Sequence, residues 1–289
     1  MELAFSTNGY VKFSLAESIK SIAALGYRGV EILADSPHIN PLTISERECD
    51  DIVNMLASCK LKVSNINANT AICLYGKNRL PEEILFGPSL ASSDSQLRAQ
   101  RVEYTLKAID LAAKLGAHCV SITSGRLTPG NPPDNAFRHL IASLSRVLEH
   151  ALKRNVLIGI EYEPGLLVES EEDFLQLVQT INCPNLGLNL DIGHSHVAGE
   201  NVCEVIARNS GRIWNVHIED ILGRRHYHLI PGEGDIDFTR VLSALYYCNY
   251  RSYLTVELYT YQDDSAEAAR QSLAYLQDTL TKLGAKTII

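Results

Sequence analysis

The sequence predicts an α/β protein in which eight parallel strands, each followed by a helix, close into a (β/α)8 TIM barrel. Short apolar segments alternate with longer segments of helical periodicity, and eight such pairs can be counted with none left over. Four apolar segments end on Glu161, Asp191, His217 and Glu257, at spacings of 30, 26 and 40 residues, and each spacing holds a loop, a helix and a turn. Because barrels of this kind reach 289 residues as one unit, we expect a single domain over residues 1–289.

Helix-start signals mark the first two strand–helix pairs. The first four strands are expected in ELAFST, GVEIL, KVSNINAN and AHCVSITSG. Ser14 and Glu17 form a capping box after the first strand, in which each side chain satisfies a backbone donor, and Gly26 ends that helix in the left-handed conformation. A second capping box is expected from Thr43 to Glu46, ahead of the second helix.

The remaining helices follow from apolar periodicity and from capping residues. Ser170, with Asp173, caps the helix after the fifth strand, VLIGIEYEP. In the glycine-containing segment PGEGDIDF, Asp235 or Asp237 caps the helix that follows. The other helices are expected at about residues 94–115, 136–153, 202–209, 238–247 and 265–283.

The longest irregular stretch runs from about Thr70 to Ser92. Loops of this length inside a compact domain are uncommon and often functional. Because the stretch follows a strand, it should lie over the rim on which barrel enzymes build their sites. We expect it to act as a lid, the alternative being a surface insertion without a role.

Composition and charge narrow the choice of partner. A net charge of −8 and a pI of about 5.6 disfavour DNA or RNA. No apolar run is long enough for a membrane span, and the N-terminal segment MELAFSTNGY lacks the basic start and apolar core of a signal peptide. The seven cysteines are scattered without a C-x-x-C pair, which is typical of reduced thiols. We therefore expect a cytoplasmic protein that acts on a small molecule.

The four residues at the strand ends form a candidate metal site. In a closed barrel the carboxyl ends of the strands converge on one rim, so Glu161, Asp191, His217 and Glu257 should meet. A buried carboxylate costs several kcal/mol unless something compensates it. For one carboxylate alone, pairing with Arg or Lys explains its position equally well, but three with a histidine favour a cation. Three oxygen ligands and one nitrogen suit Mn, Mg or Co better than a structural Zn.

Three further histidines lie near the same rim. His194 follows Asp191 by three residues, and His226 and His228 are one residue apart, so in an extended segment they face the same side. They are candidates for a second metal or for substrate binding, and the alternative is a supporting role around the first metal or exposure to solvent.

Together these motifs resemble the xylose isomerase-like TIM-barrel superfamily, which includes ketose 3-epimerases, inosose dehydratases and the endonuclease IV group. The resemblance extends over most of the chain, including the segment from FGPSLASS to SITSG. Its motifs are Glu161, the Asp191-x-x-His194 pair, His217 followed by Glu219-Asp220, PGEGDIDF and Glu257.

The resemblance implies a metal-dependent sugar isomerase or epimerase of carbohydrate metabolism. In the ketose 3-epimerases, residues matching Glu161, Asp191, His217 and Glu257 bind one divalent metal, and the two glutamates exchange the proton next to the carbonyl through a metal-stabilised enediolate. We expect the same here on a small sugar, polyol or hydroxy-carbonyl compound, with Mn, Mg, Co or Zn as cofactor. This chain departs from the epimerases at His228, where they have a substrate-binding arginine. Barrels of this group often pair, which makes a homodimer an expectation.

Three alternatives stay open. A dehydratase of the inosose dehydratase type would use the same enolate, and a non-catalytic barrel would keep the metal without turnover. An endonuclease IV-like phosphodiesterase would need three zincs. Its third-metal ligands correspond to His194, His226 and His228, with an aspartate at the position of His226. Its first-metal histidines would fall near Asn67 or Asn69 and near Thr123.

Overall fold

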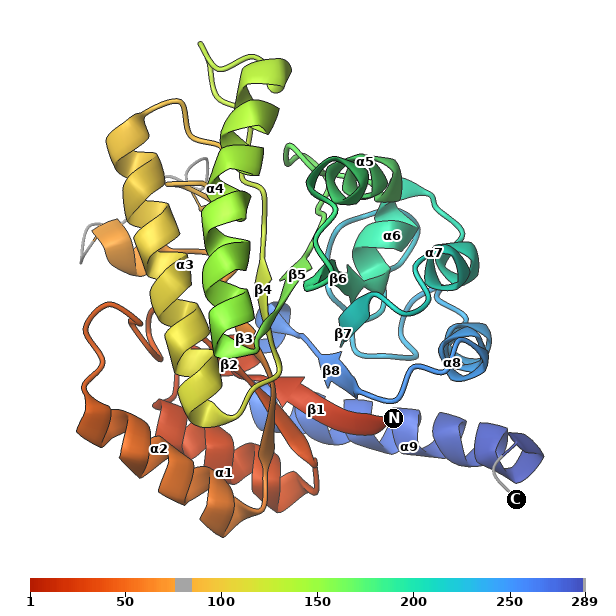
Figure 1. Ribbon diagram of the computed structural model, residues 1–289. Helices are drawn as coiled ribbons and strands as arrows, with labels where there is room; N and C mark the ends of the chain where they lie inside the picture. The colour runs from red at the N-terminus through yellow and green to blue at the C-terminus, as the bar shows by residue number, and fades with distance from the viewer. Residues whose placement is uncertain (76–84, 288–289) are drawn as a thin grey trace.

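The computed structural model describes residues 1–75 and 85–287 and contains a closed barrel of eight parallel strands (Figure 1). The strands follow one another around the barrel in sequence order, and the first pairs with the last through the register of Ala4 with Thr255. The predicted fold class is therefore confirmed. The strands are β1 (Glu2–Ser6), β2 (Gly29–Leu33), β3 (Lys62–Asn67), β4 (Cys119–Ile122), β5 (Leu157–Ile160), β6 (Leu186–Asp191), β7 (Ile213–Ile218) and β8 (Tyr253–Val256).

Helices surround the barrel, with α3 and α4 side by side and α9 beside the N-terminus (Figure 1). None of the helices within the described residues combines the length and the apolar character that crossing a bilayer requires. The α-helices are α1 (Leu15–Leu25), α2 (Glu46–Cys59), α3 (Ser95–Leu115), α4 (Pro133–Arg154), α5 (Glu171–Ile181), α6 (Ile192–Ala198), α7 (Val202–Arg208), α8 (Phe238–Tyr247) and α9 (Ser265–Thr287).

The expected capping box at Ser14 and Glu17 is present, and Gly26 ends α1 with φ +104°. The second box was misplaced: it joins Ser45 to Glu48, two residues beyond the predicted pair Thr43 and Glu46. The backbone N–H groups of residues 43 and 44 both donate to the Asn40 carbonyl, so the preceding turn includes position 43 and the chain becomes extended only at Ser45. Sequence spacing alone does not separate these two overlapping motifs.

The sequence also did not predict α6, the seven-residue helix directly after β6. Asp191 is its N-cap, and the Asp191 carboxylate accepts a hydrogen bond from the His194 backbone N–H at 2.7 Å. The short helix carries His194 back over the end of the barrel, which an extended loop would not do.

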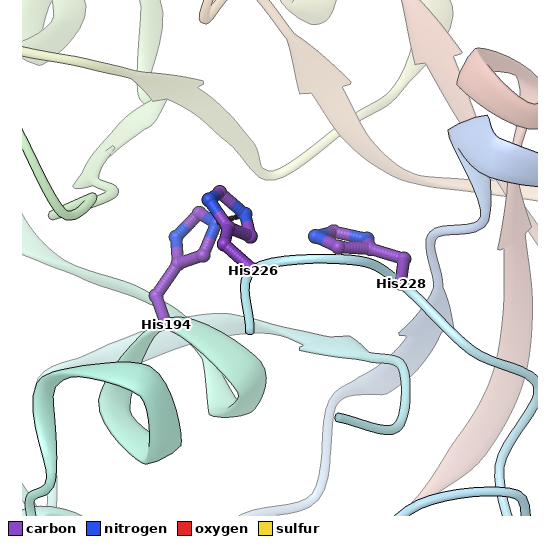
Figure 2. A group of neighbouring side chains, drawn as sticks. All are labelled: His194, His226 and His228. Carbon is purple, nitrogen blue, oxygen red and sulfur yellow. Dashed lines mark hydrogen bonds between the residues drawn. The ribbon is translucent and has the colours of Figure 1, made fainter. Parts of the chain in front are cut away.

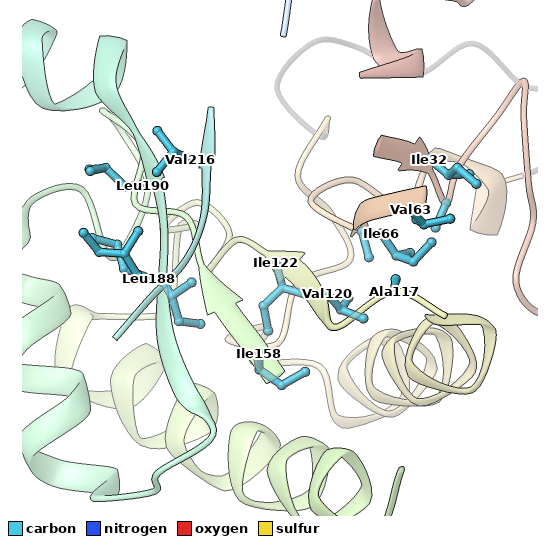
Figure 3. Close-up of a cluster of buried hydrophobic side chains, with 14 of the residues drawn as sticks. Ile32, Val63, Ile66, Ala117, Val120, Ile122, Ile158, Leu188, Leu190 and Val216 are labelled. Atoms are coloured by element: carbon cyan, nitrogen blue, oxygen red, sulfur yellow. The ribbon is translucent and has the colours of Figure 1, made fainter. Parts of the chain in front are cut away.

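Alternate side chains of β6 face the apolar core and the interior of the barrel. In β6, Leu186, Leu188 and Leu190 are buried in the apolar core, while Asn189 and Asp191 make contacts inside the barrel. Figure 3 shows Leu188 and Leu190 in this core. The same alternation in the neighbouring strands brings polar side chains together at the carboxyl ends of the strands.

Candidate metal centre at the barrel mouth

The four residues predicted at the strand ends meet at one point. Glu161 directly follows β5, Asp191 ends β6, His217 lies near the end of β7, and Glu257 directly follows β8. All four are buried, and one potential ligand atom from each lies within 4.8 Å of the others. Residues separated by up to 96 positions in the chain (257 − 161) are therefore adjacent because parallel strands end on the same rim.

The two ring nitrogens of His217 have different surroundings. Its Nδ1 lies 3.1 Å from Glu161 Oε2, 3.6 Å from Glu257 Oε2 and 3.8 Å from Asp191 Oδ2. Its Nε2 lies 2.7 Å from Glu31 Oε2 on the opposite side of the ring. If the Nε2–H group donates to Glu31, the Nδ1 lone pair faces the three carboxylates.

Glu31, in the middle of β2, is a member of the site that sequence reasoning missed. Its side chain is fully buried and accepts hydrogen bonds from the amides of Asn65, at 2.8 Å, and Asn67, at 3.1 Å, as well as contacting His217. The signal was a single carboxylate inside the apolar strand GVEIL, where an uncompensated charge would cost several kcal/mol.

The carboxylates in this cluster create an environment that favours a positive charge. Burial, with the carboxylates of Glu161 and Glu31, raises the pKa of Glu257 to about 8 against the opposing effect of His217. Burial disfavours a charged His217, but the carboxylates of Glu31, Glu161 and Glu257 outweigh it and raise the pKa of the imidazole well above its usual value. Asp191 Oδ2 is buried and accepts no hydrogen bond from an N–H group or a hydroxyl among the described residues. Its neighbour is the carboxyl of Glu219, whose pKa is raised well above its usual value by burial and by Asp191. A buried carboxylate without a basic partner, together with the mixed oxygen and nitrogen donors, fits a divalent cation.

Three histidines lie beside this cluster (Figure 2). His194 comes from α6, and His226 and His228 come from the loop between β7 and α8. As expected from their spacing, His226 and His228 both line the same cavity. Burial lowers the pKa of His228 to about 3, so this ring is neutral.

A cavity of about 420 Å³ opens over the site. Glu163, which was not predicted from the sequence, also lines it, and burial raises the pKa of this carboxyl to about 7. The polar lining includes Asn67, Glu161, Glu257 and the three histidines, and the apolar lining includes Val11, Leu33, Ile72, Leu85, Phe86 and Tyr259. The cavity lining therefore combines ionisable groups with apolar side chains.

The irregular stretch from Thr70 to Ser92 contributes to this cavity in part. Thr70, Ile72, Leu85 and Phe86 line it. Residues 76–84, on which the expectation of a lid also depended, lie outside the described residues.

The loop that carries PGEGDIDF is fixed by a carboxylate from the end of β7. Asp220 accepts hydrogen bonds from the backbone N–H groups of Gly232, Gly234 and Ile236, at 2.8, 2.8 and 3.1 Å. Of the two aspartates proposed as caps for the following helix, Asp237 is the N-cap of α8, its carboxylate accepting from the Arg240 N–H.

A second hollow, of about 480 Å³, lies at the amino ends of the strands. His118, which precedes β4, lines it together with Trp214 and Arg251. Its described lining contains no aspartate or glutamate, so the ionisable groups predicted from the sequence gather only at the opposite end, where barrel enzymes have their sites.

A closed parallel barrel with buried carboxylates and imidazoles at the carboxyl ends of its strands has the organisation of a TIM-barrel enzyme. The family model described as xylose isomerase-like TIM barrel matches residues 19–279, and the chain belongs to this family. The predicted resemblance is thereby confirmed.

Two named relatives are epimerases. Fructoselysine 3-epimerase of Shigella flexneri is 24% identical over 279 residues, covering 94% of this chain and 96% of the relative. L-ribulose-5-phosphate 3-epimerase of Shigella boydii serotype 18 is 24% identical, covering 88% of this chain and 86% of the relative. These relatives agree with the prediction of an enzyme of the sugar epimerase and isomerase group.

Solved structures share the fold over nearly the whole chain. A D-tagatose 3-epimerase-like protein superposes with a TM-score of 0.82 at 23% identity, covering 99% of both chains. The IOLI protein, solved with a bound zinc atom, superposes with a TM-score of 0.77 at 21% identity, covering 98% of this chain and 99% of that one.

Proposed function

We propose that this chain is a divalent-metal-dependent epimerase or isomerase of a small sugar, polyol or related hydroxy-carbonyl compound. The observation that carries the proposal is the buried set of Glu161, Asp191, His217 and Glu257, of which Glu161 and Glu257 line a cavity. A divalent cation bound by these residues would polarise the carbonyl and hydroxyl oxygens of the substrate and make the neighbouring C–H group acidic.

Two glutamates of the set are placed to move that proton. Glu161 and Glu257 come from the ends of β5 and β8, and both line the cavity. One of these carboxylates can remove the proton from carbon, and the other, on the opposite face, can return a proton to the enediolate. Two groups that reach the substrate from different strands can serve its two faces, as inversion at one carbon requires.

Hydrogen bonds keep these two glutamates in position. The amides of Asn8 and Asn67 donate to Glu257 Oε1 at 2.9 and 3.0 Å, and the Asn189 amide donates to Glu161. An amide donor orients a carboxylate without supplying a proton in exchange, so both glutamates keep their acid–base capacity.

The named epimerases among the relatives support this assignment over hydrolysis. Asn67 and Thr123 stand at positions that correspond to the first-metal histidines of the endonuclease IV group. Asn67 donates to Glu257, and the Thr123 hydroxyl donates to the Asn69 carbonyl. Neither side chain provides an imidazole ligand, which counts against three-zinc phosphodiesterase chemistry.

Solvent-exchange experiments test the proposal. The protein would be loaded with Mn²⁺ or Co²⁺ and incubated in D2O with a panel of ketoses and their phosphates, and deuterium incorporation would be followed by mass spectrometry and NMR. Glu257→Gln and Glu161→Gln should fold but lose exchange by at least about 100-fold, the scale of general acid–base catalysis. Undiminished exchange in Glu257→Gln would overturn the assignment.

A matched control is Glu171→Gln, which changes a buried glutamate that pairs with Arg208 and Asn209 outside the described cavity lining. This variant should retain exchange.

A dehydratase is the second candidate, and the neutral imidazole of His228 beside the cavity favours it. The epimerases have an arginine at this position, and an arginine guanidinium does not give up its proton. The neutral imidazole at this position could instead accept a proton from the substrate and pass it to the leaving hydroxide, which departs as water. Product mass separates the two reactions, because dehydration removes one water and epimerisation leaves the mass unchanged.

A further inference from the structure

We propose that Arg101 is a positioning residue: from α3, outside the barrel, it fixes residues 68–73, the segment after β3 that forms part of the cavity wall. The side chain of Arg101 is only 1% exposed. Its Nη2 group donates hydrogen bonds to the carbonyl oxygens of Ala68 and Asn69, at 2.5 and 3.2 Å. The effect on catalysis rests on the proposed function, whereas the effect on the segment does not.

Arg101 lacks the partners that usually compensate a buried guanidinium. The ion pairs formed by arginines among the described residues do not include it. Its Nε and Nη1 are buried and have no hydrogen-bond partner among the described residues. Burying a cation with unsatisfied donors costs free energy, and an apolar side chain of similar volume is often at least as stabilising. The stability of the fold therefore does not explain why a guanidinium lies here.

Asp35, which follows β2, fixes the same segment at the other end. Its carboxylate is also buried and accepts hydrogen bonds from the Thr70 hydroxyl at 2.5 Å and from the backbone N–H groups of Ile72 and Cys73 at 2.7 and 2.8 Å. The positive charge of Arg101 thus binds carbonyl oxygens at the start of the segment, and the negative charge of Asp35 binds donors further along. Two buried charges hold a few residues of irregular backbone.

The position of this backbone matters to the cavity. Asn69, Thr70 and Ile72 line it. Asn67, the last residue of β3, directly precedes the segment, and its amide donates to Glu257 Oε1 at 3.0 Å. A shift at the start of the segment would move both the cavity wall and the amide that orients Glu257. Misplacement by about 1 Å can cost an enzyme about 100-fold in rate, so a fixed backbone here has a value for catalysis beyond its contribution to stability.

Amide hydrogen exchange on the full-length protein tests the effect on the segment. Arg101→Met keeps much of the volume of the side chain but removes the charge and the donors. The backbone N–H groups of residues 68–73 should exchange about 10-fold faster or more in this variant, because the segment opens more often. Arg101→Lys, which keeps the charge and one donor group, should be intermediate, and it replaces the first variant if Arg101→Met does not fold. Unchanged exchange in the segment would overturn the proposal.

Steady-state kinetics separate positioning from a loss of stability. A variant that only loses folded molecules loses kcat in proportion and keeps its KM, whereas a displaced cavity wall raises KM. On the ketoses that exchange deuterium with the wild type, Arg101→Met should raise KM and lower kcat/KM by about 10–100-fold, and Arg101→Lys should recover part of the loss. An unchanged KM, or a loss of rate that matches the loss of folded protein by circular dichroism, would refute the positioning role.

Arg98→Met is the matched control. Arg98 lies one turn earlier in α3 and also donates to loop carbonyls, those of Ser92 and Ser93, which are outside the described cavity lining. This variant should keep both the hydrogen exchange of residues 68–73 and the KM of the wild type. If no ketose exchanges deuterium with the wild type, the proposed function and the effect of Arg101 on catalysis fail together, while hydrogen exchange still decides whether Arg101 fixes the segment.

Discussion

Replacing Glu31 by glutamine should weaken cation binding at the four-residue site although Glu31 itself is not one of the proposed ligands. Glu31 Oε2 lies 2.7 Å from His217 Nε2, and both side chains are fully buried. The carboxylate thus selects the tautomer in which Nε2 carries the proton and the Nδ1 lone pair faces Glu161, Asp191 and Glu257. Glutamine keeps the shape but offers a neutral oxygen, and its amide can also turn an N–H group toward the ring.

The size of the effect follows from the kind of hydrogen bond that is lost. Hydrogen bonds to charged groups contribute about 1.5–3 kcal/mol and neutral ones about 0.5–1.5 kcal/mol, so the difference is about 1–1.5 kcal/mol. Loss of a partner that orients a metal-binding histidine typically costs about 10–100-fold in metal affinity, which corresponds to about 1.4–2.8 kcal/mol. We therefore expect cation affinity to fall about 10-fold or more, with the free energy of unfolding of the metal-free protein lowered by about 1 kcal/mol.

Calorimetric titration of the stripped protein with Mn²⁺ measures the affinity, and urea unfolding measures stability. Glu171→Gln is again the control, since it also removes the charge of a buried glutamate but one paired with Arg208. It should lose stability without losing cation affinity. If folded Glu31→Gln bound Mn²⁺ within twofold of the wild type, the reasoning about the His217 tautomer would be refuted.

Three other predictions concern the loop, the pH and the cation. Asp220→Ala should lower the free energy of unfolding by about 3 kcal/mol, at about 1 kcal/mol for each hydrogen bond to Gly232, Gly234 and Ile236. The variant should also expose this loop to proteases, and unchanged cleavage in limited proteolysis would contradict the prediction. Cation affinity should rise as the pH increases to about 8 and beyond, because Glu257 must lose its proton to bind and so must His217, whose pKa is raised well above its usual value. A flat calorimetric profile would argue against both residues as ligands. Chelation should lower the midpoint of thermal unfolding in scanning fluorimetry, and Mn²⁺ should restore it, unless no cation binds the native state.

The sequence was sufficient to predict the barrel and the meeting of Glu161, Asp191, His217 and Glu257. Each ends an apolar segment, where burial of a polar group requires a reason, and the parallel topology supplies the common rim. Glu31 lacked such a signal because it lies within its strand, and its partner His217 is 186 residues away in the chain. Its role depends on distance across the barrel interior, which no local pattern encodes.

Ambiguous local sequence patterns explain the other differences between the predicted and the observed structure. The segment TISERE contains two overlapping pairs that satisfy the capping-box pattern, and the turn on Asn40 decides between them. IGHSHVA has too few apolar residues to show helical periodicity, and α6 forms because Asp191 caps it and the rim supports it. In both cases a contact outside the local pattern selects the structure.

The side chains that contact the buried carboxylates help to explain why a cation should bind at this site. Among the described residues, the side chains that donate to Glu31, Glu161 and Glu257 are asparagine amides, His217 and, at Glu31, the Ser6 hydroxyl, and none is a lysine or arginine. An amide satisfies a carboxylate oxygen without neutralising its charge, whereas a basic side chain would form a salt bridge that a metal would have to break. The asparagines therefore hold the carboxylates in place and leave their negative charge available. Replacing one of them, as in Asn67→Lys, should fill the site with a fixed positive charge and abolish divalent-cation binding in the calorimetric titration, while Asn67→Asp should not.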